Sequence, residues 1–184
     1  MCWVNGQGGM AATGTTLHID AHRTLDDGRM LVENTGQRRF RVVDVVQERP
    51  VLVCDVEYLD GEEEEEGEGE LKELGAEVMQ LFQNVLDLNF KLKDMDAEEL
   101  AGKIDFAAKE RMGPREISFW IASMFSDAES EQQFLLEMES TELRLQREKS
   151  LLAEAQKYLS AQSALKGVFA VGGEDEADGP GLMP

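Results

Sequence analysis

The sequence predicts an α+β fold in which a small antiparallel sheet comes first and a helical bundle with a long C-terminal helix follows. In the strongest strand signal, apolar Leu52, Cys54, Val56 and Tyr58 alternate with acidic Asp55 and Glu57. This period of two is typical of a half-buried strand. From residue 70 onward the apolar residues recur at helical spacing instead. Strands followed by helices, rather than alternating with them, indicate the α+β class.

Four strands are expected, at residues 15–19, 29–33, 40–46 and 51–58. Asp26-Asp27-Gly28 predicts the first turn, since glycine adopts positive φ easily and aspartate tolerates it. Asn34-Thr35-Gly36 predicts a second turn. Pro50 has no backbone N–H, so it is expected at the corner between the last two strands.

The first helices are expected at about residues 71–88 and 96–109, separated by a break at residues 89–94. Gly113-Pro114 predicts the start of another helix, because proline loses no hydrogen bond at the first helical position. This helix carries the clearest amphipathic stripe of the chain, formed by Ile117, Trp120, Ile121, Met124 and Phe125. Trp120 is therefore interpreted as a core residue, with a ligand platform as the alternative.

Two further helix starts are indicated by capping residues. Ser126 and Glu129 have the spacing of a capping box. Ser140 and Thr141 can cap a long final helix, for which Gly167 is a natural end. The domain organisation predicted from these patterns comprises a flexible leader (1–14), the β part (15–60), an acidic linker (61–70), a helical bundle (71–167) and a disordered acidic tail (168–184).

The charge of the chain is extreme, with a formal net value of -20. Much of it lies in residues 60–77 and in the tail, where like charges repel and keep the chain extended. Nucleic acid is not expected as a partner, because no basic patch is present to neutralise phosphates. No apolar run has the length of a membrane span, so no membrane contact is expected either. Only Cys2 and Cys54 are present, which favours a reducing intracellular compartment over a disulfide framework.

Sequence patterns for catalysis or metal binding are weak, and no catalytic residue, cofactor or metal is predicted. His18 and His22 lie on one face of a strand but about 13 Å apart, too far to share one ion. Lys149 and Ser150 fall on an exposed helix face, without the pocket that a nucleophile needs. A basic group at Arg38, Arg39 and Arg41 is interpreted as a salt-bridged strand surface, with an anion site as the alternative.

The consecutive glutamates Glu62, Glu63, Glu64, Glu65 and Glu66 have two interpretations. They lack the Asp/Asn/Gly spacing of a calcium loop, so a solvated linker is favoured. As an alternative, the run is itself an electrostatic surface for a basic partner, and binding would then depend steeply on salt.

Several motifs in order resemble the Lon N-terminal domain, the substrate-binding domain of ATP-dependent Lon proteases. The strand pair that begins Gly36-Gln-Arg-Arg-Phe40 and continues to Glu57 is similar to the Gly-x-x-Arg-Phe region of that family. Residues 113–125, 131–138 and 157–166 resemble its helical half as found in stand-alone Lon-domain proteins of plants and algae. The residues that carry the resemblance are expected to be structural: Gly36, Arg39, Phe40, Pro50, Pro114, Phe119 and Trp120.

The resemblance implies a partial PUA-like β pseudo-barrel joined to a helical bundle, and a non-catalytic module that recognises protein substrates. Its partners would be protein clients or a protease or chaperone, as in an adaptor for protein quality control. The alternative is a regulatory part of an ATP-dependent protease system whose ATPase and peptidase lie on another chain. The family's pattern begins with strands that would lie before residue 14. They are not recognised in this sequence, which predicts an N-terminally truncated barrel. The likeness to plant and algal proteins implies a plastid location, although no transit peptide is recognised.

Overall fold

The computed structural model describes residues 2–4, 9–59, 68–93, 111–125 and 128–171. For residue 3 and residues 167–171 it describes the backbone alone. The chain forms two compact units, and each is built from separate stretches of sequence. The sheet unit contains Met1–Glu68 and Ala122–Arg144, whereas the helical unit contains Gly69–Ile121 and Leu145–Pro184. This division differs from the predicted one, since residues 122–144 group with the strands rather than with the bundle.

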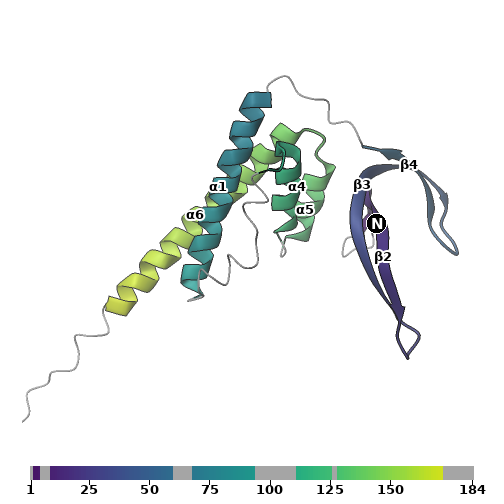
Figure 1. The fold of residues 1–184 in the computed structure, drawn as a ribbon, viewed down its shortest axis with the longest axis horizontal. Coiled ribbons are helices and arrows are strands. Elements are labelled where there is room, and N and C mark those ends of the chain that lie inside the picture. Colours follow the sequence, from purple (N-terminus) through teal and green to yellow (C-terminus); the bar gives the residue numbers. More distant parts are fainter. Residues whose placement is uncertain (1, 5–8, 60–67, 94–110, 126–127, 172–184) are drawn as a thin grey trace, which may run out of the picture. The chain divides into compact units, whose positions relative to one another are not determined.

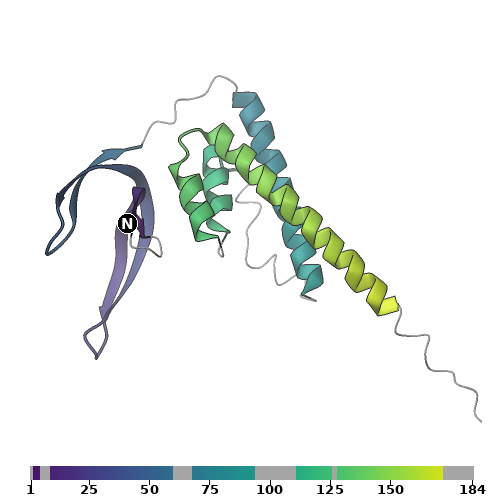
Figure 2. The same ribbon diagram turned by 180° about the vertical axis from the view of Figure 1, so that it is seen from behind.

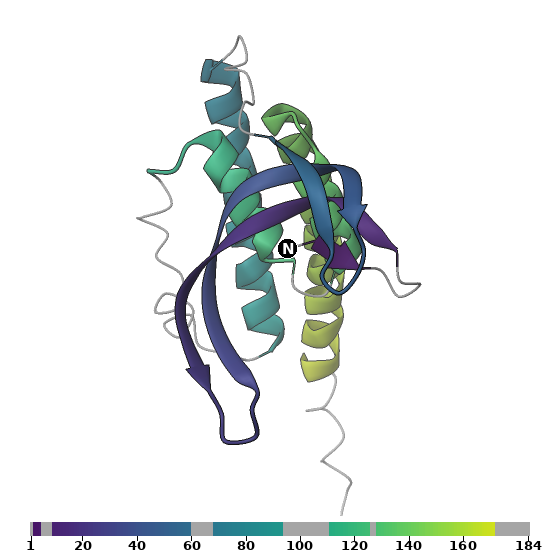
Figure 3. The same ribbon diagram turned by 90° about the vertical axis from the view of Figure 1, so that its right-hand side faces the viewer.

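The sheet unit is built on four antiparallel strands in the order β1-β2-β3-β4. Their bounds are β1 Cys2–Val4, β2 Met10–Thr24, β3 Met30–Gln47 and β4 Val53–Tyr58. Figure 3 shows that β2 and β3 are long and strongly bent. Each of the two strand pairs β2–β3 and β3–β4 contains two register irregularities. Such β-bulges increase the local twist and bend of a strand.

Two predictions for the sheet were wrong. Asn34-Thr35-Gly36 forms no turn but lies inside β3, where Gly36 pairs with Leu17 next to a register shift. Glycine in a strand often marks such a bulge. The sheet also begins earlier than predicted, since β1 and the first residues of β2 lie in the expected leader at 1–14. The turn at Asp26-Asp27-Gly28 is confirmed, with Gly28 at φ 83°.

One helix of the sheet unit, α5 (Glu129–Glu137), packs against β2. The side chain of Gln133 donates from Nε2 to the carbonyl oxygen of Thr13 on that strand, at 3.1 Å. Both residues are buried, so this bond satisfies polar groups that water does not reach. Ala128 occupies the N-cap position without a side-chain cap bond, and Ser126, on which the predicted capping box depends, lies outside the described residues.

The helical unit consists of α1 (Glu68–Leu92), most of α4 (Pro114–Ser123) and most of α6 (Thr141–Val171). Figures 1 and 2 show α1 and α6 side by side. An ion pair between Lys149 Nζ and Glu77 Oε1 (2.7 Å) joins the two helices, and Lys166 Nζ donates to the carbonyl oxygen of Leu92 (3.1 Å). Their buried apolar core includes Val78, Met79, Phe82, Ile117, Ile121, Leu145 and Leu152.

The helices extend beyond their predicted ends. α1 continues through residues 89–92, where a break was predicted, and α6 continues past Gly167 to Val171. In both cases the local signal for a helix end was too weak to stop the helix, since propensity is only a weak guide to helix boundaries. The helix predicted at 96–109 and the glutamates at 62–66 lie outside the described residues. Among the described helices, none combines the length and the apolar character that a bilayer crossing requires.

Ser140 acts as the N-cap of α6, as predicted. Its Oγ accepts a hydrogen bond from the N–H of Leu143 at 3.3 Å, and its carbonyl accepts from the N–H of Arg144 at 3.1 Å. Ser140→Ala removes the side-chain acceptor and should lower the free energy of unfolding by about 1 kcal/mol. Urea denaturation followed by circular dichroism measures this. Ser160→Ala, at an exposed mid-helix position, is the control and should not destabilise; equal effects of the two variants would contradict the assignment.

Candidate protein-binding surface

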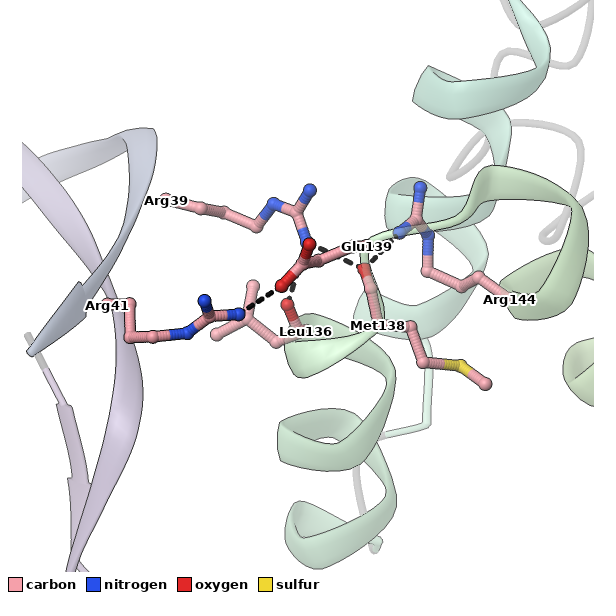
Figure 4. A network of polar contacts seen from close by, with 6 residues as sticks. All are labelled: Arg39, Arg41, Leu136, Met138, Glu139 and Arg144. Carbon is pink, nitrogen blue, oxygen red and sulfur yellow. Dashed lines mark hydrogen bonds and ion pairs between the residues drawn. The ribbon is translucent and has the colours of Figure 1, made fainter. Parts of the chain in front are cut away.

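One face of the sheet is held against the C-terminal end of α5 by arginines of β3. Arg39 is only 7% exposed, and its Nη1 donates to the carbonyl oxygens of Leu136 (2.9 Å) and Met138 (2.8 Å). Arg41 forms an ion pair with Glu139 (Figure 4). These carbonyls lie at the end of α5, where a cation is favourable because the helix dipole is negative. The Arg39 face of the sheet is therefore the covered one.

Arg144, at the start of α6, contributes to the same network. Its guanidinium is fully buried and donates from Nη1 to the carbonyl of Met138 at 2.8 Å and from Nη2 to Thr141 Oγ1 at 3.1 Å. Figure 4 shows the two guanidinium groups of Arg39 and Arg144 converging on the Met138 carbonyl. The predicted salt-bridged strand surface is thus partly right: Arg41 pairs with Glu139, whereas Arg39 bonds to backbone carbonyls of residues 136 and 138, and Arg38 lies over the Tyr58 ring.

The opposite face of β3 and β4 is mostly apolar, and the Arg38 guanidinium lies over the ring of Tyr58, 3.8 Å from its centroid. Side chains alternate along a strand, so Phe40 and Val42 point away from the side that carries Arg39 and Arg41. The register pairs Phe40 with Tyr58, Val42 with Val56 and, after a bulge, Val45 with Cys54. We call these six residues the apolar face: Phe40, Val42, Val45, Cys54, Val56 and Tyr58. Val45, Val56 and Tyr58 are 42%, 39% and 44% exposed, respectively.

Exposed apolar side chains continue beyond the apolar face into the two hairpins. The β3–β4 connection and its flanks expose Val43, Val46, Val51, Leu52 and Val53, and the β2–β3 hairpin exposes Leu17, Ile19, Met30, Leu31 and Val32. By contrast, the described helices expose few large apolar residues, namely Phe134, Leu143, Tyr158 and Leu165, with Met124 in the turn after α4. Single exposed apolar residues are ordinary, so it is their number in the sheet unit that favours an interaction surface there.

The residues singled out in the sequence occupy different parts of the structure. Gly36, Arg39 and Phe40 lie on β3, and Pro50 lies exposed in the β3–β4 connection. Pro114 is the first residue of α4, where Phe119 and Trp120 are half-buried. The Trp120 and Phe82 rings make an edge-to-face contact at 5.2 Å between centroids. Trp120 thus packs on the core residue Phe82 but is itself only half-buried, whereas the sequence predicted a core position for it.

The groups that carry reactive chemistry are not brought together. Lys149 pairs with Glu77, whereas Ser150 Oγ donates to the carbonyl of Gln146. Burial raises the pKa of the Cys2 thiol, and Cys54 raises it further, which is opposite to the activation of a nucleophilic cysteine. Within the described ranges, no cluster of three or more His, Cys, Asp or Glu side chains could hold a metal ion.

Comparison with known families agrees with this fold. A family model described as the ATP-dependent protease La (LON) substrate-binding domain matches residues 5–154. The chain belongs to this family. A solved structure, the Lon N-terminal domain protein from Xanthomonas campestris, is 21% identical with a TM-score of 0.51 and covers 83% of this chain and 72% of that chain. At this identity the likeness shows a shared fold. No curated protein matches the chain.

Membership of the LON substrate-binding family confirms the family predicted from residues 36–57 and 113–166, and with it the α+β fold. Sequence reasoning missed the contacts that build the covered face. Gln133 and Arg144 are ordinary polar residues on helices, and nothing in their spacing indicates burial.

Proposed function

We propose that this LON substrate-binding domain is a non-catalytic module that binds unfolded or specific protein substrates through the apolar face of its sheet. The single observation that carries the proposal is the asymmetry of the sheet: one face is covered by α5, and the other exposes Val45, Val56 and Tyr58. Apolar surface of this kind favours binding of unfolded chains, because both partners bury apolar area on association.

The proposal extends to the setting of the domain. An adaptor role in protein quality control fits a module that binds substrate, and the ATPase and peptidase of such a system would then lie on another chain. The family match supports substrate binding, while the adaptor role and the plastid location remain predictions.

The test replaces two valines of the apolar face by threonine, which keeps the shape and the β propensity of valine. Val45→Thr/Val56→Thr replaces two methyl groups by hydroxyls and should weaken binding of reduced, alkylated α-lactalbumin about tenfold, at roughly 0.8 kcal/mol per buried methyl-sized group. Fluorescence anisotropy of the labelled substrate measures the dissociation constant.

The matched control is Leu165→Asn, which makes an exposed apolar residue of α6 polar outside the sheet. This variant should bind as the wild type does. Equal binding by the wild type and the double-valine variant, with unchanged circular dichroism, would overturn the apolar face as the binding site.

A further inference from the structure

The helical unit contains a cavity of about 620 Å³ between the N-terminal half of α1 and the start of α4. Its volume lies within the range of ligand pockets. Apolar side chains line much of it, among them buried Met79 and Ile117 and half-buried Met112 and Pro114. Methionine is unbranched and flexible, so it adapts to ligands of different shape. We call this cavity the α1–α4 groove.

Two exposed cations border the apolar part of the α1–α4 groove. Lys72 comes from the first turns of α1, and Arg111 comes from the segment before α4. Two amides, from Gln80 and Gln83, also line the groove and offer hydrogen bonds. In a chain with a formal net charge of -20 and only 18 lysines and arginines, such a basic border is unusual. The groove therefore combines apolar contact with positive charge and is complementary to an acidic, apolar ligand.

We propose that the α1–α4 groove binds a short peptide segment of a protein substrate in which apolar side chains lie next to an acidic residue. The apolar side chains would contact Met79 and Ile117, and the carboxylate would pair with Lys72 or Arg111. This inference rests on the proposed function, because it takes the ligand to be a protein substrate. It assigns a second binding site, in the helical unit, that adds charge selectivity to the apolar face.

The test compares two short synthetic peptides that share one Leu-Phe-Leu core, flanked in one by aspartates and in the other by lysines. Binding is measured by fluorescence anisotropy at about 0.15 M salt, where charges more than about 8 Å apart are largely screened. Lys72→Glu/Arg111→Glu should weaken binding of the acidic peptide about tenfold and strengthen binding of the basic peptide. The reason is that attraction of the acidic peptide becomes repulsion at two partly exposed positions.

The charge control is Lys91→Glu/Lys93→Glu, which makes the same change in net charge at two exposed lysines near the other end of α1. It should leave both peptides within twofold of wild type. A second variant, Ala76→Phe, fills the groove from an exposed position of α1 and should abolish binding of the acidic peptide. Asp87→Phe adds the same ring elsewhere on α1 and should not.

Binding of the acidic peptide to Lys72→Glu/Arg111→Glu or to Ala76→Phe at wild-type strength would overturn the proposal. So would an equal loss in Lys91→Glu/Lys93→Glu, since the effect would then come from bulk charge. Failure of the proposed function is a separate result. It would be seen if Val45→Thr/Val56→Thr bound unfolded α-lactalbumin as strongly as the wild type does, whatever the result with the two peptides.

Discussion

Arg39→Ala is expected to lower the free energy of unfolding of the sheet unit by about 2–4 kcal/mol. The guanidinium makes two charge-assisted hydrogen bonds to the carbonyls of Leu136 and Met138 in a position that water hardly reaches. Each such bond contributes about 1.5–3 kcal/mol, and its removal also leaves a buried carbonyl without that donor. The Met138 carbonyl retains Arg144, which limits the loss. Urea denaturation followed by circular dichroism measures the change.

Arg41→Ala is the matched control, since Arg41 lies two residues along the same strand. Its side chain is 41% exposed and its ion pair with Glu139 is accessible to solvent. Exposed ion pairs contribute at most about 1 kcal/mol, so this variant should remain close to wild type. If Arg39→Ala were no more destabilising than Arg41→Ala, α5 would not be held to the sheet by Arg39.

Phe82→Ala is expected to lower the free energy of unfolding of the helical unit by about 3–5 kcal/mol. Phe82 is 4% exposed on α1 and contacts Trp120 of α4 edge to face. Removing a buried aromatic ring loses its transfer free energy and leaves a cavity that the helices fill only in part. Phe134→Ala, at a position that is 50% exposed, is the control and should change stability by less than about 1 kcal/mol.

A double-mutant cycle isolates the contact between the two rings. The interaction term among wild type, Phe82→Ala, Trp120→Ala and the double variant should be about 0.5–1.5 kcal/mol, as for other edge-to-face pairs. If the stability losses of the two single variants simply added up in the double variant, the contact between Trp120 and Phe82 would contribute nothing to stability.

Local patterns in the sequence predicted the elements whose structure depends on neighbours along the chain. Alternation in residues 52–58 located β4 and its apolar side, and Pro114 marked the first residue of α4. Ser140 was recognised as a cap because its acceptor serves an N–H three residues away. Each of these signals acts within one turn or one strand, so no tertiary information was needed.

The contacts that build the candidate sites were not predictable in the same way. Arg39 bonds to residues 97 and 99 positions away, and nothing near residue 39 indicates a helix end there. The α1–α4 groove likewise has Lys72 and Arg111 in its lining, although the two residues are far apart in the sequence. The turn predicted at Gly36 was wrong for a related reason, because the local turn signal was outweighed by the pairing of β2 with β3.

The bonds of Arg39 also bear on the order in which the protein can assemble during synthesis. The sheet unit is interrupted in sequence by residues 69–121, and its strands gain α5 only after the chain has grown past residue 138. Closing so long a loop is entropically costly and tends to slow folding. A nascent chain of this protein therefore exposes its completed strands while residues 59–138 are synthesised, and in that interval a chaperone can bind them before α5 is made.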